Sequence, residues 1–413
     1  MLFPKTTYPS PPPRVVITGA GIVTSLGRGW AANAAAFRAG KTGFRPVTRF
    51  DVSRQRVKTA AEVDLPRQRP ATQLTEKQEQ RLDRASRLLL LAAEEAWRQS
   101  GWSASDCLPV VLGTTAGGMT LGEDYFRQAV GQPHRQKGQP TRALHYQAQT
   151  QAGMVLNAFG SVGPVTIISN ACASGTNAIG GAWERIRRGQ AERILTGGYD
   201  ALSQMVFSGF DALQALSPTR CRPFDAHRDG LAIGEGAAVL TLETLASAQK
   251  RGAEILGEIA GYGVSMDRHH LTQPHPEGDA ACHAMERACE SAQVAAENID
   301  YVNAHGTGTV LNDQAEAKAI SRWAGRQAGR LPVSSTKAGT GHLLGGAGAV
   351  EAVVCLMSLR EQWLPPELAF ETPDAACAFR IVARPEDASV QVALSNSFGF
   401  GGVNASLVLR RWL

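Results

Sequence analysis

The stretch VTIISNACASG, residues 165–175, joins a run of branched residues to a cysteine and a group of small residues. The four residues at its start favour a buried strand, because β-branched side chains pack well on a pleated sheet. A helix is expected over residues 174–188, so Cys172 lies where the strand leads into the helix. The first N–H groups of a helix are free and its dipole is positive there, which predicts a lowered cysteine pKa. Cys172 is therefore the candidate nucleophile, and the other six cysteines are interpreted as core residues.

Strand-like and helix-like segments alternate on both sides of this stretch. In the first half, strands are expected at 14–18, 110–113, 165–168, 194–196 and 239–243, and helices at 74–100, 174–188 and 245–251. In the second half, strands are expected at 255–259, 301–304, 333–335, 393–396 and 406–410, and helices at 280–295, 313–323 and 342–362. This alternation predicts an α/β fold with mostly parallel pairing, and the similar succession of elements indicates an internal duplication. The expected organisation is a tail (1–13), a first half (14–252) that carries Cys172 and a second half (253–413).

The composition excludes several classes of protein. Of the 413 residues, 43% are hydrophobic and 19% are charged, which is ordinary for a globular chain and too apolar for a disordered one. The 43 glycines follow no three-residue period, so a collagen is excluded. No apolar run is long enough to span a membrane, and the proline-rich N-terminus lacks the apolar centre of a signal peptide. We therefore expect a cytoplasmic protein that does not enter a membrane.

The cysteines and the charge agree with that expectation. Seven cysteines without a CxxC pair are typical of free thiols in a reducing compartment. The formal net charge is +5, but no dense basic stripe is present, so we expect no nucleic-acid partner. A mildly basic surface suits an acidic protein or an anionic substrate.

Two histidines follow expected strands and lie beside glycines. His305 stands in VNAHGTGT, residues 302–309, and Lys337 and His342 stand in SSTKAGTGH, residues 334–342. In open α/β sheets, ligands gather at the carboxyl ends of strands. No orienting carboxylate accompanies the histidines as it would in a protease, whereas two neutral imidazole donors can stabilise an enolate. This pattern indicates carbon–carbon bond formation.

Two other patterns carry less weight. VVITGAGIVTSLG, residues 15–27, resembles a dinucleotide fingerprint, but Thr24 stands where its third glycine should be, so we interpret residues 19–21 as a glycine turn. A group of histidines matches no zinc spacing, so no metal site is expected there: His269, His270, His275 and His283.

The chain resembles the β-ketoacyl-acyl-carrier-protein synthases, the condensing enzymes of fatty-acid and polyketide assembly. The resemblance is carried by six motifs: NACASG (170–175), RPFDAHRDG (222–230), GEGAAV (234–239), NAHGTGT (303–309), SSTKAGTGHLLGGAGAVEA (334–352) and NSFGFGGVNASLV (396–408). It implies a thiolase-like fold with two duplicated βαβαβ-type halves in an αβαβα layered sandwich. It also implies a decarboxylating condensation of an acyl group with malonyl-acyl-carrier protein.

The resemblance assigns roles to individual residues. Cys172 resembles the acyl-accepting nucleophile, and His305 and His342 resemble the pair that promotes malonyl decarboxylation. Lys337 would hold the local charge pattern with Glu351 as its partner. The backbone N–H groups of Cys172 and Phe400 would form the oxyanion hole. The remaining roles would fall to a gate (Phe400, Asp267, His270), to contacts with the phosphopantetheine arm (Thr307, Thr309) and to docking of an acidic carrier protein (Lys77, Arg81, Arg84, Arg220).

Three features depart from the fatty-acid members of the family. The loop between residues 219 and 222 is short, as in polyketide-type ketosynthases, and residues 131–151 are unusually polar. Ala116 stands in a Gly-Gly loop at which the resemblance implies an acyl-pocket position, where the fatty-acid members carry bulkier aliphatic residues. These departures predict long or rigid acyl chains, including polyunsaturated or aryl-bearing ones as in polyene-type assembly. The alternative is that backbone shifts refill the space and the enzyme makes ordinary fatty acids.

The resemblance implies no tightly bound cofactor, because substrates arrive on the phosphopantetheine arm of an acyl carrier protein. It also implies a homodimer or a heterodimer with a related ketosynthase or chain-length-factor subunit. Two alternatives remain. A non-catalytic chain-length-factor-like subunit would lack the nucleophile, and a non-decarboxylating thiolase would place a second cysteine in its C-terminal loop, whereas Cys377 lies outside that loop.

Overall fold

A single large sheet organises the chain. The computed structural model describes residues 11–66 and 69–413, so most of the tail expected at 1–13 lies outside it. Twelve strands form the sheet: β1 (Val15–Thr24), β2 (Gly27–Arg28), β5 (Val110–Gly113), β6 (Val165–Ile168), β7 (Arg193–Asp200), β8 (Gly236–Thr244), β9 (Gly257–Met266), β10 (Tyr301–Asn303), β11 (Pro332–Ser334), β13 (Arg380–Ile381), β15 (Val392–Gly399) and β16 (Val403–Arg410). Two-stranded sheets join β3 (Phe44–Pro46) to β4 (Thr59–Ala61) and β12 (Trp363–Leu364) to β14 (Glu386–Asp387).

The sheet consists of two halves with the same strand order. The first half runs β1-β8-β7-β5-β6 and the second runs β9-β16-β15-β10-β11, with β1 and β9 paired antiparallel between them. In each half the first strand pairs with the fifth and the fifth with the fourth, both antiparallel, and the next two pairs are parallel. The duplication predicted from the sequence is confirmed. The prediction of mostly parallel pairing is wrong, because long antiparallel strands fill the middle of the sheet.

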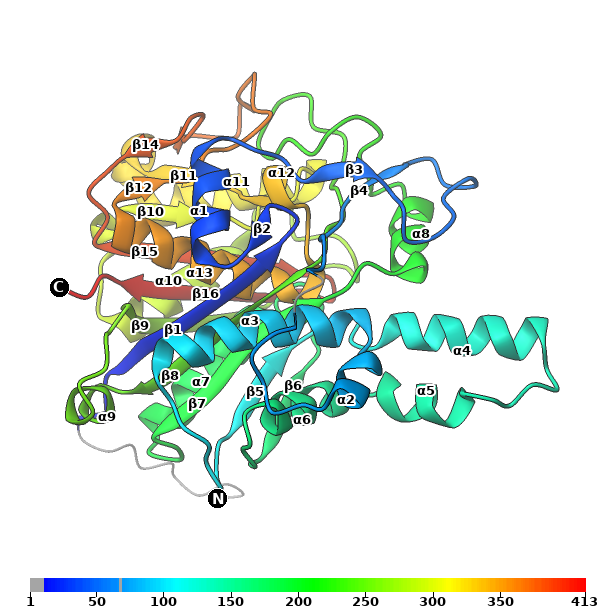
Figure 1. Cartoon of the computed structure of the whole chain (residues 1–413). Coiled ribbons are helices and arrows are strands. Elements are labelled where there is room, and N and C mark those ends of the chain that lie inside the picture. The colour runs from blue at the N-terminus through cyan, green and yellow to red at the C-terminus, as the bar shows by residue number, and fades with distance from the viewer. Residues whose placement is uncertain (1–10, 67–68) are drawn as a thin grey trace, which may run out of the picture.

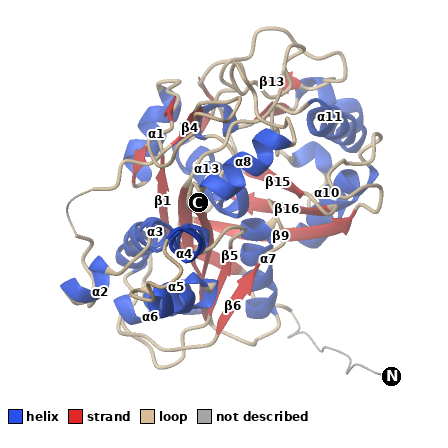
Figure 2. Ribbon diagram, turned by 90° about the vertical axis from the view of Figure 1, so that its right-hand side faces the viewer, coloured by secondary structure: helices blue, strands red, loops and turns tan. Residues whose placement is uncertain are grey.

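The two halves of the sheet form two layers, and helices form a layer between them and one on each outer face, which makes five layers in all (Figures 1 and 2). Helix α3 (Arg84–Ser100) covers β1 and β8, and α10 (Asp279–Ala292) covers β9 and β16. Helices α7 (Ser174–Arg187) and α13 (Ala347–Glu361) pack against each other in the central layer. Helix α13 is buried on every side, as expected for a helix that is apolar all round. The remaining helices are α1 (Trp30–Arg38), α2 (Glu76–Gln80), α4 (Met119–Gly131), α5 (Gln139–Tyr146), α6 (Ala148–Ala158), α8 (Gln204–Ala212), α9 (Leu245–Lys250), α11 (Val310–Ala324) and α12 (Lys337–Thr340), with short 3₁₀ turns η1 (Ala296–Asn298), η2 (Gly325–Arg330) and η3 (Leu344–Gly346).

Two elements near the N-terminus differ from the sequence predictions. The glycine turn expected at 19–21 is instead the middle of β1. A Cβ atom at Gly19 would lie 2.1 Å from the carbonyl oxygen of Ala96, so glycine is needed there because α3 packs directly on the strand. The helix expected at 74–100 is two helices, because the Asp83 side chain accepts a hydrogen bond from the Ser86 N–H and starts α3 anew.

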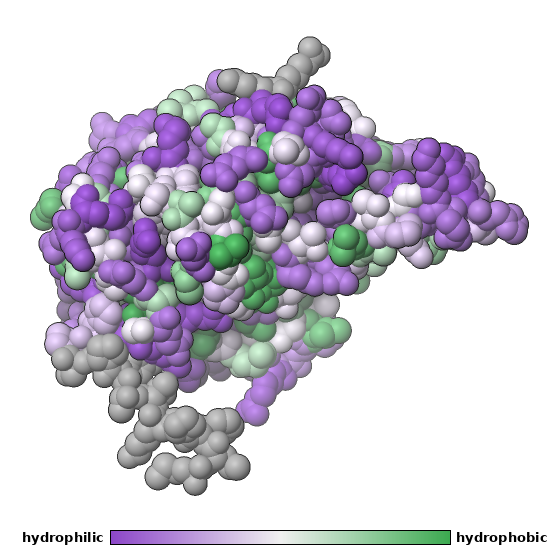
Figure 3. Space-filling view, turned by 60° about the horizontal axis from the view of Figure 1, so that its bottom comes forward, coloured by the Kyte–Doolittle hydropathy of each residue, from purple (hydrophilic) through white to green (hydrophobic). Residues whose placement is uncertain are grey.

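The polar segment 131–151 contains α5 and parts of α4 and α6. Helices α4 and α5 form an arm that projects from the body of the molecule, and the tip of this arm is hydrophilic (Figures 1 and 3). Within the described part of the chain, no helix combines the length and the hydrophobicity that crossing a membrane requires.

Candidate active site

Cys172 lies in a sharp turn between β6 and α7. Ala171 has a φ of 57°, in the left-handed region that non-glycine residues rarely adopt. The Ser174 hydroxyl accepts a hydrogen bond from the N–H of Asn170 at 2.9 Å and donates one to the carbonyl of Ala171 at 2.6 Å. Such strain is typical of functional sites.

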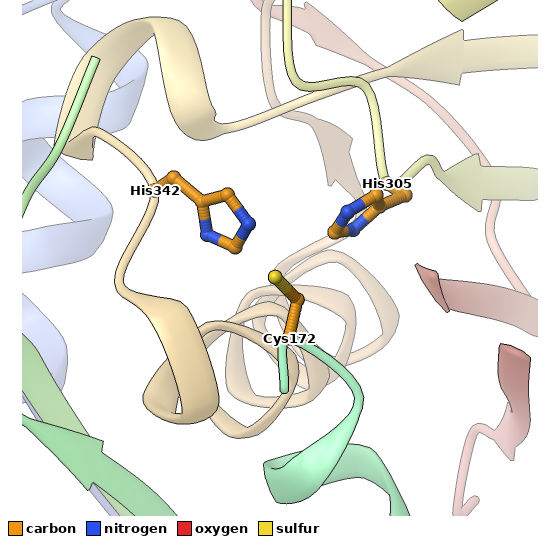
Figure 4. Close-up of side chains that lie close together, drawn as sticks. All are labelled: Cys172, His305 and His342. Atoms are coloured by element: carbon orange, nitrogen blue, oxygen red, sulfur yellow. The ribbon is translucent and has the colours of Figure 1, made fainter. Parts of the chain in front are cut away.

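Three side chains from distant segments meet at this turn. The sulfur of Cys172 points into the space between the imidazoles of His305 and His342 (Figure 4). The sulfur and one ring nitrogen of each histidine lie within 4.8 Å of one another, and the two rings are nearly perpendicular, with centroids 5.3 Å apart. The exposed fractions are 8% for Cys172, 2% for His305 and 1% for His342. The structure thus brings together three of the four residues predicted as catalytic; Lys337, the fourth, lies behind His305.

The hydrogen bonds of His342 fix its tautomer. Its Nδ1 accepts the N–H of Leu344 at 3.2 Å, so the ring proton of the neutral form sits on Nε2. This Nε2 atom is buried and has no partner among the described residues, and the same is true of His305 Nδ1. A cysteine with two histidines is also a donor set suited to zinc. A protonated Nε2, however, donates a hydrogen bond and does not ligate a metal.

A buried ion pair accompanies the histidines. Lys337 donates to the carbonyl oxygen of His305 at 2.5 Å and forms a short ion pair with Glu351, and both side chains are buried. Burial, helped by the positive charge of Lys337, holds the pKa of both imidazoles well below the ordinary histidine value. Both rings are therefore neutral at pH 7.

The pKa of Cys172 does not follow the sequence prediction. Burial raises the pKa of this thiol to about 12, although the charge of Lys337 and the N–H of Phe400 favour the thiolate. The predicted lowering is wrong because the loss of water outweighs these contributions. The resting group is a thiol, and its proton must leave as an acyl group arrives.

Two buried acids on α11, which the sequence analysis missed, hold the His305 loop. Glu316 accepts the N–H groups of His305 at 2.8 Å and Gly306 at 2.7 Å, and Asp313 accepts that of Thr307 at 2.9 Å. Burial raises the pKa of Glu316 to about 7. Their i, i+3 spacing directly after the NAHGTGT motif was a signal for two acids on one helix face.

Two loops meet beside the cysteine. The N–H of Gly401 donates to the carbonyl of Leu271 and that of Asp267 to the carbonyl of Gly402, each at 2.7 Å. Phe400 is 39% exposed and stacks on Phe210 of α8, with ring centroids 5.9 Å apart. His270 is exposed on the same loop as Asp267. The three residues predicted as a gate thus belong to two adjoining loops, and Phe210 is a neighbour that the sequence did not reveal.

A cavity of about 350 Å³ connects the three residues with the surface. It is lined by Thr307 and Thr309, whose hydroxyls lie 2.8 Å apart, and by Phe400. Exposed apolar residues surround its mouth: Leu213, Leu271, Val310 and Leu311. Ala116 is not among its lining residues, because the adjoining glycine loop is turned toward Asp200, which accepts the Ala116 N–H at 2.8 Å.

None of the predicted docking residues lines this cavity, although Arg220 stands between Thr219 and Cys221, which bond to the lining residues Asp229 and Thr307. Lys77 and Arg81 are exposed at α2, and Arg220 is half-exposed and paired with Glu371. The surface position expected for Arg84 is wrong. Its side chain is only 9% exposed and binds the buried carboxylate of Glu235, with Nε to Oε2 at 2.7 Å.

Comparison with known proteins agrees with this architecture. The model of the β-ketoacyl synthase N-terminal domain matches residues 13–248, and that of the C-terminal domain matches residues 256–371. The chain is 37% identical over 410 residues to 3-oxoacyl-[acyl-carrier-protein] synthase 2 of Staphylococcus aureus (strain COL), covering 97% of this chain and 98% of the relative.

Solved structures resemble it over nearly the whole chain. One is the ishigamide ketosynthase/chain length factor, with a TM-score of 0.91, 32% identity and coverage of 97% of this chain and all of that one. Another is the AntDE:AntF complex of a type II polyketide acyl-carrier protein with its ketosynthase, with a TM-score of 0.86, 28% identity and the same coverage.

The fold is therefore the thiolase-like fold of condensing enzymes. The chain belongs to the β-ketoacyl synthase family. It is an acyltransferase that performs the condensing step of fatty-acid or polyketide synthesis, and neither a non-catalytic subunit nor a thiolase is favoured.

Proposed function

We propose that the enzyme condenses an acyl group held on Cys172 with malonyl-carrier protein, releasing carbon dioxide and forming β-ketoacyl-carrier protein. The observation that carries this proposal is the cysteine sulfur lying between two buried, neutral imidazoles with unpartnered nitrogens. A neutral imidazole N–H can stabilise an enolate without protonating it completely.

The first half of the reaction loads the cysteine. The sulfur attacks the acyl thioester, the carrier thiol leaves with the proton, and the acyl group remains on Cys172. The N–H of Phe400 is directed at this sulfur, and together with the N–H of Cys172 it would stabilise the oxyanion.

The second half forms the new bond. His305 and His342 donate hydrogen bonds to the malonyl thioester oxygen while its carboxylate leaves as carbon dioxide, and the enolate carbon attacks the acyl thioester. The Cys172 thiolate leaves and the β-ketoacyl-carrier protein departs. Lys337, which is paired with Glu351, holds the His305 carbonyl, and its positive charge helps to keep both imidazoles neutral.

Substrates would reach the site on the phosphopantetheine arm of a carrier protein, with no tightly bound cofactor. The cavity suits such an arm, since Thr307 and Thr309 offer hydroxyls along its wall and Asp267, His270 and Phe400 border it. The solved relatives suggest the partners: an acyl-carrier protein in one complex and a chain length factor in another. We assign this chain a carrier protein and a dimer, either with itself or with a related ketosynthase or chain-length-factor subunit, in the cytoplasm. The two halves would divide at residue 252.

Malonyl decarboxylation should be insensitive to moderate acid. The imidazoles act while neutral, and their lowered pKa values mean that they gain a proton only well below pH 6.5. The rate of carbon dioxide release from malonyl-carrier protein should therefore stay constant from pH 8 to pH 6.5. If the rate instead declined around pH 7, and this decline were absent in Glu316→Gln, the pH dependence would come from protonation of Glu316.

Charge reversal at Arg81 and Arg220 should weaken the carrier protein's binding. The double variant Arg81→Glu/Arg220→Glu should raise the apparent KM for acyl-carrier protein about tenfold at low salt, and less above 0.1 M, where charges are screened over about 10 Å. Arg360→Glu is the control, because this arginine is similarly exposed and paired with Glu254 at another surface. An unchanged KM at both salt concentrations would remove Arg81 and Arg220 from the docking site.

Ala116 does not line the cavity at Cys172, but its neighbour Thr115 donates a hydrogen bond to the carbonyl of Ala171 at 3.0 Å, directly before the cysteine. An acyl chain that extends from Cys172 past this contact would meet Ala116, whose small side chain should then set the acyl length. We assign this enzyme long or rigid acyl chains, including polyene-type ones, and expect Ala116→Phe to reject them while accepting short ones. Overpacking costs roughly 1–3 kcal/mol, or about ten- to a hundredfold for the long substrate alone. The measurement is a competition between short and long acyl-carrier proteins, scored by the acyl mass on Cys172. Ala104→Phe, at an exposed position, is the control, and an unchanged preference in Ala116→Phe would contradict the pocket assignment.

A further inference from the structure

Glu367 is a buried carboxyl group with no part in the mechanism above. It lies in the loop after β12, is 1% exposed, and is fixed by its own N–H, which donates to the carbonyl of Val382 at 2.7 Å. Its Oε2 accepts the N–H of Ser335 at 2.7 Å, whereas its Oε1 has no hydrogen-bond partner among the described residues. Buried polar atoms without a hydrogen-bond partner are rare in folded proteins, so a buried carboxyl group with one unpaired oxygen is a candidate for a functional role.

Ser335 connects this acid to the catalytic loops. Its hydroxyl donates to the carbonyl of Gly306 at 2.6 Å and accepts the N–H of Lys337 at 3.3 Å. Gly306 directly follows His305, and a Cβ atom at Gly306 would lie only 2.5 Å from the Cβ of Ser335. Ser335 and the backbone of Gly306 are therefore so close that no side chain fits between them. A movement of Ser335 would displace the loop that carries His305.

The surroundings favour an uncharged Glu367. The titratable groups that interact electrostatically with it come from several segments around it: Lys337, Asp313, Glu316, Cys221, Cys377 and Tyr301. Lys337 is the cation of this set, and it is already bound to Glu351 and to the His305 carbonyl. Burial and the two acids of α11 raise the pKa of Glu367 well above the ordinary value.

We propose that Glu367 is a positioning residue of this active site, whose buried carboxyl group fixes Ser335 and, through it, the placement of His305 and Lys337. It contacts no substrate and supplies no proton. Its carbonyl oxygen accepts the Ser335 N–H without bringing a further negative charge beside Lys337.

Three substitutions test this proposal. Glu367→Gln keeps a neutral acceptor at the same place and should retain kcat for malonyl decarboxylation within about threefold. Glu367→Asp keeps a carboxyl group, but its shorter side chain no longer reaches the N–H of Ser335. Glu367→Ala removes the carboxyl group. These two should lower kcat by about ten- to a hundredfold, the range expected when a catalytic group is misplaced by about 1 Å. KM for malonyl-carrier protein and acylation of Cys172, followed by intact mass, should change by less than about threefold, because the altered loop carries the histidine and not the nucleophile.

Each alternative predicts a different pattern. If Glu367 were ionised, Asp would replace it better than Gln, and the pH profile of Glu367→Gln between pH 6 and 9 would be displaced from that of the wild type; we expect the two profiles to coincide. If its role were only to stabilise the fold, decarboxylation and Cys172 acylation would fall together with the thermal midpoint. Either result overturns the proposal. Should Glu367→Ala not fold, the Gln and Asp variants decide, with Glu386→Gln in β14, a half-exposed acid, as the control.

Discussion

Replacing Cys172 with alanine should abolish both acylation of the enzyme and condensation. We expect this because the turn at Ala171 and the loop of Phe400 place the sulfur in the cavity between the two imidazoles, where an acyl thioester would reach it. Intact-mass analysis after incubation with acyl-carrier protein should show one added acyl group on the wild type and none on Cys172→Ala. Cys107→Ala removes an exposed thiol and should behave as the wild type.

The same position separates the two half-reactions. By analogy with the family, Cys172→Gln is expected to keep releasing carbon dioxide from malonyl-carrier protein, because the two imidazoles remain in place. If Cys172→Ala still gained an acyl group, another residue would be the nucleophile. The raised pKa of Cys172 adds a kinetic expectation: loading should accelerate as pH rises from 7 to 9, because the thiolate fraction grows with pH.

The sequence revealed those parts of the fold in which local pattern and tertiary packing agree. The strands predicted at 110–113 and 165–168 have the same bounds in the structure, because short runs of branched residues flanked by turns have few alternatives as strands. Residues 19–21 were misinterpreted because glycine in a strand and glycine in a turn look alike locally. The close approach of Ala96 to Gly19 that decides between them comes from a helix far along the chain.

In the site, too, the residues in local motifs could be predicted and the long-range contacts could not. Cys172, His305 and His342 could be predicted because each follows a strand and stands in a motif. Glu367 could not be predicted, since it meets Ser335 from 32 residues away through a loop without a recognisable pattern. The direction of the Cys172 pKa was wrong because a sequence shows the helix that follows but not the depth of burial.

Substitution of either histidine should reduce malonyl decarboxylation without preventing acylation of Cys172. His305→Ala and His342→Ala each remove one donor from the developing enolate, and losing one such donor typically costs about 10²–10³ in rate. Both variants should therefore lose carbon dioxide release from malonyl-carrier protein by that factor, while Cys172 still accepts acyl groups more slowly. His283→Ala, an exposed histidine on α10, serves as the control for both measurements.

The two histidine variants should also differ in thermal stability, because the two rings make different hydrogen bonds. His342 Nδ1 is engaged by the Leu344 N–H, so His342→Ala leaves that buried donor unpaired and should lower the thermal midpoint as well as the rate. His305 Nδ1 has no partner among the described residues, so the ring's removal there should affect the rate with a smaller loss of stability. Equal and complete loss of Cys172 acylation in both variants would assign the histidines a structural role, because only the decarboxylation step depends on their donors.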